Sequence, residues 1–189
     1  MDPILKEFPN SFDTERLTIR CPMPGDGPAL NEAVLESIEE LRPWLPWAKE
    51  TPTLENTEAN VRKGYTRFLN REDLWLLLFL KDTNICIGGS GLHRIDWGVP
   101  KFEIGYWLRT SYVGQGYMTE AVAGITDFAF DMLGAKRVEI RCDALNERSA
   151  SVAQRLNFPL EGILRCEARN QTSGKLRDLM IFAKIASDR

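Results

Sequence analysis

The sequence is poor in the residues that build metal sites and disulfide frameworks. It contains one histidine and four cysteines, and Cys21, Cys86, Cys142 and Cys166 lie far apart without a C-x-x-C pair. A structural zinc site needs about four such ligands in closely spaced pairs. We therefore expect no metal site and no disulfide framework. We interpret the cysteines as buried, reduced thiols of a cytoplasmic protein.

Long apolar runs and basic clusters are also absent. No apolar segment approaches the roughly 20 residues that a membrane span requires, and the N-terminus has no basic start followed by an apolar stretch. The formal net charge is -3, and no block of Lys and Arg stands out as a surface for duplex nucleic acid. These absences predict a soluble, cytoplasmic protein with no membrane and no DNA partner.

The composition is that of an ordinary globular domain. Hydrophobic residues make up 43% of the 189-residue chain and charged residues 27%, which excludes a disordered, collagen-like or coiled-coil protein. No repeat or low-complexity linker divides the sequence, and its Trp and Phe residues are spread along the whole length. We therefore expect a single domain over residues 1–189 with one continuous core.

Hydrophobic periodicity predicts a strand and two helices in the N-terminal part. After a strand at 17–20, one helix ends near Arg42, with Asp26 as a candidate N-cap. A second helix begins at Leu54. The segment Trp44–Trp47 contains Pro46 and cannot be helix interior. The apolar positions expected on the inner faces of the two helices are Leu30, Val34, Ile38 and Leu41, then Val61, Tyr65, Phe68 and Leu69.

Continuous apolar runs predict an antiparallel meander of strands at 74–80, 85–95 and 102–108. A long helix then follows Gly114–Gly116 and ends at Gly134. Its expected inner face is Met118, Val122, Ile125, Ala129 and Met132. A strand at 137–143, a helix at 147–156 and strands at 158–166 and 175–184 complete the chain. We therefore expect an α/β (α+β) fold: a mixed, mostly antiparallel sheet of about seven strands with helices on both faces.

The glycine-containing segment Gly114–Thr119 joins a strand to a helix. Free backbone N–H groups and the helix dipole at such a junction form an anion site, and the glycines let a phosphate approach the main chain. Two glycines are weak evidence, since such pairs are as often only turns. A P-loop is excluded because its Lys-Ser/Thr is missing, and a dinucleotide fingerprint because its third glycine is missing. The segment predicts a phosphate-bearing ligand held mainly by main chain.

Several motifs in order resemble the GNAT acetyltransferases, specifically their RimJ/RimL branch. They are Glu103–Leu108 followed by Gly114–Ala121, then Asn146–Ser149 and Leu156–Gly162, with Thr14–Leu17 and Trp44–Trp47 nearer the start. The resemblance covers roughly residues 13–185, nearly the whole chain. It implies a GNAT-type fold over this core and an N-acetyltransferase that moves an acetyl group directly to an amine.

The resemblance implies acetyl-CoA as the phosphate-bearing ligand. Its pyrophosphate would rest on the loop of Gly114, Gln115, Gly116, Tyr117, Met118 and Thr119. Its pantetheine arm would lie along a splayed strand edge at Tyr106, Trp107 and Leu108, with Asn146 bonded to an amide of that arm. Val113 stands where the family often has Arg or Gln, and Met118 where it often has Gly or Ala. Main-chain contacts survive both differences, but Val113 removes a side-chain contact and puts the affinity for the cofactor in doubt.

The family match makes Ser149 the proton donor for the leaving thiolate. From residue type alone, Asn146 equally suits a helix N-cap with Ser149 in the first turn, and both roles are compatible. For the base, Glu103 and Glu167 are candidates, each of which could instead be a surface or ion-paired carboxylate, and water-mediated deprotonation is a third route. The sequence does not decide which of these routes deprotonates the acceptor amine.

Three other residues have both a functional and a structural interpretation. His93 is a candidate base or acceptor-side residue, although a lone histidine in a strand is more often structural. Cys142 could form an acetyl-cysteine intermediate, but its alternation with apolar neighbours favours a buried thiol. Trp44 and Trp47 would line the acceptor side, or else only fill the core.

The identity of the amine acceptor is predicted from the resemblance and from the basicity of amines. The group within the branch that this chain most resembles acetylates the N-terminal serine of a ribosomal stalk protein. A peptide α-amine with a pKa of ~7.7–8.0 is partly neutral near pH 7.5, whereas a lysine at ~10.4 needs a stronger base. We expect the N-terminal α-amine, Ser or Ala, of a ribosomal protein. Alternatives are a small amine (amino acid, polyamine or aminoacyl antibiotic) or a non-catalytic acyl-CoA-binding module. Relatives suggest a homodimer by analogy only.

Overall fold

The computed structural model describes residues 2–170 and 173–188, which build a sheet of eight strands in the order β1-β2-β3-β4-β5-β6-β8-β7. The strands are β1 Ser11–Asp13, β2 Leu17–Arg20, β3 Leu74–Leu80, β4 Cys86–Asp96, β5 Lys101–Leu108, β6 Arg137–Asp143, β7 Leu160–Arg169 and β8 Leu176–Ile185. All neighbours are antiparallel except β5 and β6, which are parallel. The predicted mixed, mostly antiparallel sheet is confirmed. Its unpredicted strand is β1, which is too short to show a period.

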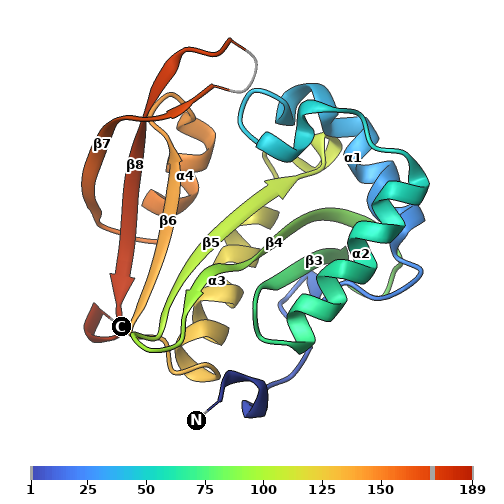
Figure 1. Ribbon diagram of the computed structural model, residues 1–189, viewed down its shortest axis with the longest axis horizontal. Coiled ribbons are helices and arrows are strands. Elements are labelled where there is room, and N and C mark those ends of the chain that lie inside the picture. The colour runs from blue at the N-terminus through green and yellow to red at the C-terminus, as the bar shows by residue number, and fades with distance from the viewer. Residues whose placement is uncertain (1, 171–172, 189) are drawn as a thin grey trace.

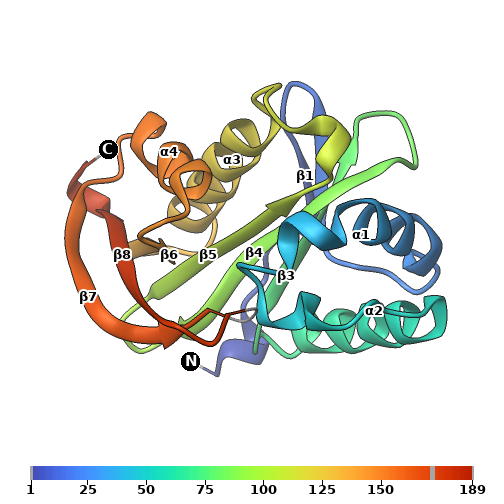
Figure 2. The ribbon, with the colours of Figure 1, turned by 90° about the horizontal axis from the view of Figure 1, so that it is seen from above.

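Helices cover both faces of this sheet (Figure 2). On one face lie α1 Gly27–Leu41 and α2 Leu54–Leu69, and on the other lie α3 Tyr117–Asp131 and α4 Glu147–Arg155. The apolar side chains form one buried cluster on each face, with Val34 and Leu77 in the first and Val122 and Ile140 in the second. The expectation of one continuous core is therefore wrong, because the sheet lies between the two clusters.

Two of the residues expected on inner helix faces are exposed instead. Leu69 is the last residue of α2, and Met132 directly follows α3; their exposed fractions are 46% and 52%. Both residues lie at the C-terminal end of a helix, and Leu133 is buried where Met132 was expected to be. The C-terminal residue of a helix often leaves the face that its periodicity predicts, because the helix no longer fixes its direction.

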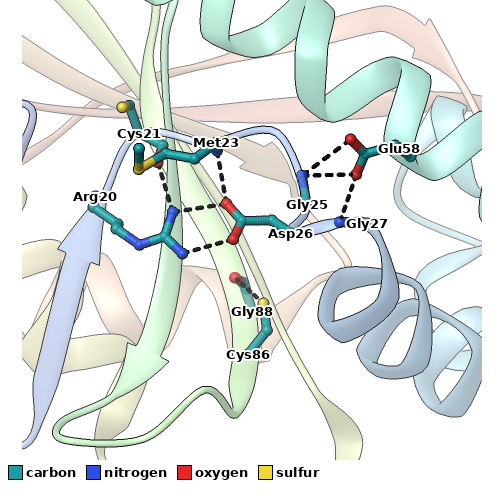
Figure 3. A network of polar contacts seen from close by, with 9 residues as sticks. All are labelled: Arg20, Cys21, Met23, Gly25, Asp26, Gly27, Glu58, Cys86 and Gly88. Atoms are coloured by element: carbon teal, nitrogen blue, oxygen red, sulfur yellow. Dashed lines mark hydrogen bonds and ion pairs between the residues drawn. The ribbon is translucent and has the colours of Figure 1, made fainter.

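Asp26 occupies the N-cap position of α1, as predicted, but its side chain binds elsewhere, as Figure 3 shows. The Asp26 carboxylate makes no capping bond. It accepts two hydrogen bonds of 2.7 Å from the Arg20 guanidinium and one of 2.7 Å from the Met23 N–H. The Gly27 N–H at the start of α1 instead donates to the carboxylate of Glu58 in α2, at 3.0 Å. The second helix therefore fixes the start of the first one.

Strands β5 and β6 are paired over only part of their length. Their parallel register joins Lys101 to Arg137, Phe102 to Val138 and Glu103 to Glu139, and ends there. Beyond that point the two strands diverge (Figure 1). The remainder of β5 keeps its pairing with β4, so the edge of residues 104–108 that faces β6 has no strand partner among the residues that the structure describes. A free strand edge offers N–H and C=O groups to a ligand.

Cysteine burial follows the prediction at three of the four positions. Cys21, Cys86 and Cys142 are buried free thiols, but Cys166 in β7 is exposed, because β7 is an edge strand. Among the described residues, no three or more His, Cys, Asp or Glu side chains come together in a way that could hold a metal ion. None of the helices in the described ranges has the length and apolarity needed to cross a membrane.

Candidate active site

The loop before α3 leaves several backbone donors free. Gly114 and Gly116 have φ values of +82° and +83°, a left-handed conformation that favours glycine. The first hydrogen bond of the helix runs from the Glu120 N–H to the Gly116 carbonyl, at 3.0 Å. The N–H groups of residues 117–119 precede it and have no acceptor within the helix. The loop therefore fits a bound phosphate group, as the sequence predicts.

The side chains of this loop take different directions. Met118 is buried in the core between α3 and the sheet, while Tyr117 and Thr119 are half-buried and Gln115 is exposed. The Gln115 side chain donates to the Ser111 carbonyl at 3.0 Å. A ligand at this loop would therefore contact Met118 only through its main chain, and the chain's Met in place of a small residue does not obstruct the free N–H groups.

Tyr106, Asn146 and Ser149 come together across the divergence of β5 from β6. The Tyr106 hydroxyl donates to the Ser149 carbonyl at 2.8 Å, and the Ser149 hydroxyl donates to the Tyr106 oxygen at 3.1 Å. The Asn146 side-chain oxygen accepts the Ser149 N–H at 3.1 Å, which makes Asn146 the N-cap of α4. Burial raises the pKa of Tyr106, although its contact with Ser149 lowers it, so the phenol stays protonated.

Trp107 and Leu108, the other predicted residues of this strand, point to opposite faces. Trp107 is buried in the cluster beneath α1 and α2, and its ring contacts that of Trp47 edge-on at 5.8 Å. Leu108 packs with the cluster beneath α3 and α4. Trp47 stands 49% exposed and Trp44 is half-buried. The indole of Trp107 therefore packs against Trp47 on the α1–α2 face of the sheet and does not lie at the free strand edge.

Glu103 lies at the last paired position of β5 and β6 and is only 16% exposed. Its Oε2 atom is 3.5 Å from the Arg94 guanidinium, yet that buried atom makes no hydrogen bond within the described structure. Burial raises the pKa of Glu103 above its ordinary value of 4.5, partly offset by Arg94 and Arg141. A buried carboxylate without a hydrogen bond is costly, and such groups gather at functional sites.

His93 lies directly opposite Glu103 in the antiparallel register of β4 and β5. Its Nδ1 is 2.8 Å from the Asp73 carboxylate. A Cβ atom at Gly105 would lie 3.2 Å from the imidazole, and one at Gly91 would lie 3.0 Å from it. The ring therefore rests on a stretch of sheet without side chains, and Asp73 fixes its orientation.

The second candidate base, Glu167, is in a different environment. It is 45% exposed, and its carboxylate is 3.6 Å from the Arg141 guanidinium. This carboxylate is therefore a solvated, ion-paired group, which matches the structural interpretation of the residue. Of the two carboxylates, Glu103 has the surroundings of a catalytic base.

The structure also bears on Cys142. Burial raises the pKa of its thiol, and a contact with Ser149 lowers it by less. A thiol that is protonated and buried is a poor nucleophile. This environment matches the interpretation as a structural thiol and favours direct transfer over an acetyl-cysteine intermediate.

Two contacts of the site could not be read from the sequence. One is the reciprocal pair of hydrogen bonds between Tyr106 and Ser149. The other joins the end of β7 to the loop after α1: the Asn170 side chain donates to the Pro43 carbonyl at 3.2 Å. This second contact brings the β7–β8 end of the sheet beside the Trp44–Trp47 segment. No sequence signal marks either pair, because their members are far apart in the chain.

Comparison with known proteins gives a consistent picture. The family model described as an acetyltransferase (GNAT) domain matches residues 16–159. "Putative ribosomal N-acetyltransferase YdaF" of Bacillus subtilis (strain 168) is 31% identical over 154 residues, covering 80% of this chain and 82% of that protein. The ribosomal-protein-serine acetyltransferase of Escherichia coli (strain K12) is 30% identical over 125 residues, covering 65% and 69%.

A solved structure is similar over nearly the whole chain. It is that of RimL, a ribosomal L7/L12 α-N-protein acetyltransferase, in complex with coenzyme A. Its TM-score is 0.84 at 26% identity, over 91% of this chain and 95% of that chain. The free donors at the start of α3 and the unpaired edge of β5 fit the phosphates and the amide-rich arm of such a ligand.

Proposed function

The chain belongs to the GNAT acetyltransferase family, and we propose that its acceptor is the N-terminal α-amine, Ser or Ala, of a ribosomal protein. It is an N-acetyltransferase, and acetyl-CoA is its acetyl donor. The observation that carries the proposal is the divergence of β5 from β6 after Glu103, with Ser149 and Tyr106 across the opening. Two similar proteins named for ribosomal-protein acetylation support the acceptor class.

The residues proposed to hold the donor use mainly their backbone. The N–H groups of residues 117–119 would bind the pyrophosphate, and the free edge of residues 106–108 would bond the amides of the pantetheine arm. Asn146 uses its side-chain oxygen as the cap of α4, which leaves its NH₂ group for an acceptor on that arm. Acetyl-CoA, when bound, supplies a thioester whose carbonyl carbon can be attacked by an amine.

Glu103 is the proposed base. Its carboxylate oxygen Oε2, which makes no hydrogen bond in the described structure, would take a proton from the α-ammonium group, whose pKa of ~7.7–8.0 already leaves part of it neutral near pH 7.5. Glu103 and Tyr106 are three residues apart, about 10 Å along a strand, and on opposite faces of the sheet. We therefore propose that the proton of the α-ammonium group reaches Glu103 through water, and not by direct contact between the two groups.

Ser149 is the proposed proton donor to the leaving thiolate. As the new C–N bond forms and the C–S bond breaks, the nitrogen releases its second proton to solvent and the sulfur takes up one proton, which the hydroxyl can supply and recover from solvent. In the structure this hydroxyl donates to Tyr106, so Tyr106 would orient it before the donor arrives. Trp44, Trp47 and His93 are proposed to line the path of the acceptor.

The proposal is tested by following thiol release from acetyl-CoA with a small panel of amines. The panel contains a Ser-initiated and an Ala-initiated peptide, an N-blocked Lys peptide and spermidine. We expect turnover with the first two only. Release only with lysine or spermidine would overturn the α-amine proposal. Coenzyme A binding without any turnover would favour the non-catalytic module.

A variant pair tests the role of Ser149 in the same assay. Ser149→Ala should lower kcat by about 100-fold, the lower range for loss of a general acid, and leave the KM for acetyl-CoA unchanged. Ser151→Ala, on the same helix, is the matched control and should keep full activity. Full activity in Ser149→Ala would remove Ser149 from the mechanism and leave the family membership untouched.

A further inference from the structure

One carboxylate of α3 is tied to the turn that precedes β2. Glu120, in the first turn of the helix, accepts hydrogen bonds from the Thr14 hydroxyl at 2.6 Å, the Arg16 N–H at 2.7 Å and the Arg16 Nε at 2.7 Å. Burial alone would raise the pKa of Glu120, but these hydrogen bonds together lower it. Glu120 is therefore ionised at neutral pH.

Arg16 also touches the loop that was assigned to the pyrophosphate. Its Nη1 donates to the Gln115 carbonyl at 3.0 Å, and its guanidinium lies 4.2 Å from the centre of the Tyr117 ring. A Cβ atom at Gly116 would be 3.5 Å from Nη2. One cation therefore contacts Gln115 and Tyr117 of the loop, lies beside Gly116 between them, and is bonded to Glu120 in the first turn of the helix.

The chain makes room for this contact one turn further along α3. A Cβ atom at Gly124 would lie 2.9 Å from the Thr14 side chain. Any larger residue would push the turn of residues 14–16 away from the helix. The close approach that brings Arg16 to the loop therefore depends on Gly124.

The charges of Glu120 and Arg16, at the start of α3, have opposite effects on a bound anion. A carboxylate in the first turn stabilises the helix dipole, but it repels a phosphate that binds the same N–H groups. The loop has no cation of its own, because residues 113–119 include neither Lys nor Arg and begin with Val113. Arg16, which is 41% exposed, is the charge that offsets Glu120 there.

We propose that Arg16 is a positioning residue of the cofactor site, which lies against the loop of residues 115–117 and acts by offsetting the charge of Glu120 so that the pyrophosphate of acetyl-CoA can bind. This inference rests on the proposed function, in that it takes the N–H groups of residues 117–119 as the phosphate site. In this proposal the segment before β2 contributes to the affinity for acetyl-CoA, whereas Ser149 and Glu103 take part in the chemical step.

The test measures the Kd of coenzyme A by calorimetry for Arg16→Met, Glu120→Gln and the double variant, at low and high salt. Methionine keeps the length of the side chain and removes its charge. Arg62→Met is the matched control, because Arg62 is also ion-paired with a glutamate, at 2.8 Å, but lies in α2. Thermal unfolding of each variant reports on folding.

Arg16→Met should raise the Kd about tenfold at low salt, on the scale of one charge at a helix N-terminus, and less at high salt. Removal of the opposing carboxylate in the double variant should restore the Kd to within about threefold of the wild type. Glu120→Gln and Arg62→Met should not weaken binding. The control Arg62→Met should also keep the wild-type kcat at saturating acetyl-CoA.

Three results would overturn the inference. The first is an unchanged Kd in folded Arg16→Met, and the second is a double variant that binds as weakly as Arg16→Met, which would indicate lost structure rather than charge. The third applies if Arg16→Met does not fold. In that case Glu120→Gln is the only test, and a higher Kd for coenzyme A in that variant would overturn the inference. A wild-type protein that fails to bind coenzyme A would instead refute the proposed function itself.

Discussion

At the scale of single residues, two carboxylates near the site have opposite surroundings. Glu120 accepts three hydrogen bonds, and its pKa is lowered. Glu103 has a buried oxygen without a hydrogen bond, and burial raises its pKa. When ionised, Glu103 therefore opposes folding while Glu120 supports it. A destabilising carboxylate is retained most readily where chemistry needs it.

Glu103→Gln should therefore make the protein more stable and less active. The folded pKa of Glu103 is raised, so the penalty of its charge is absent below the ordinary value of 4.5 and grows as the pH rises through the raised pKa. Urea unfolding should find the variant more stable than the wild type at pH values near 7, with the difference vanishing in acid. Turnover at the same neutral pH should fall at least about tenfold.

Glu120→Gln is the control of opposite sign. Because the folded pKa of Glu120 is lowered, its stabilisation is present above the ordinary value and is lost as the pH falls through the folded pKa. This variant should be less stable than the wild type at neutral pH, with a smaller deficit in acid. A Glu103→Gln protein that is also destabilised at neutral pH would contradict the assignment of Glu103.

Tyr106→Phe should show whether Tyr106 orients the Ser149 hydroxyl or instead helps to bind acetyl-CoA. The change removes a donor to the Ser149 carbonyl and the acceptor of its hydroxyl. We expect a loss of about 1–2 kcal/mol in the free energy of unfolding and a kcat lower by about tenfold, with the KM for acetyl-CoA unchanged. Tyr65→Phe, in α2, is the control. A higher KM with an unchanged kcat would mean that Tyr106 serves binding instead.

At the scale of elements, the short helix α4 carries Ser149 on its first turn. Nine residues form a marginal helix by themselves, so α4 depends on its cap and on the packing of Ala150, Val152 and Ala153. The Asn146 cap therefore fixes both the start of the helix and the position of Ser149. The same hydrogen bond from the Ser149 N–H to Asn146 therefore caps α4 and places the proposed proton donor.

Two substitutions at Asn146 distinguish the cap from the proposed contact with the donor. Asn146→Ala removes the cap and should reduce the free energy of unfolding by about 1 kcal/mol. Asn146→Asp keeps a capping oxygen but loses the NH₂ group, so it should retain stability and raise the KM for acetyl-CoA. Chemical unfolding and steady-state kinetics measure the two effects. Wild-type KM in Asn146→Asp would limit Asn146 to capping.

At the scale of the whole molecule, the order of elements was largely predictable and the contacts between them were not. Strands such as Leu74–Leu80 and helix α1 have clear periods, and the ordered motifs identify the family. The divergence of β5 from β6 shows in no local pattern, because it is a matter of register, and only the family resemblance predicted a splayed strand edge near residues 106–108. Asp26 is at the predicted N-cap position of α1, but its carboxylate makes no capping bond because Arg20, six residues earlier, binds it instead.

The site shows the same limit. Its candidate residues were predicted from motifs, but Thr14 and Glu120 are 106 positions apart and Asn170 and Pro43 are 127 apart. Pairings over such distances are fixed by the closure of the whole sheet, and no local pattern encodes them. The roles of Ser149, Glu103 and the loop residues stay predictions that the variants above test.

The most direct measurement places both kinds of amine in one substrate. A peptide with a free N-terminal Ser and one internal Lys is incubated with the protein and acetyl-CoA, and fragmentation mass spectrometry locates the acetyl group. An acetyl group on the α-amine alone is the predicted result, because the carboxylate of Glu103 is a weak base for lysine. An acetyl group on the lysine side chain would contradict the proposed acceptor and require a stronger base in this site.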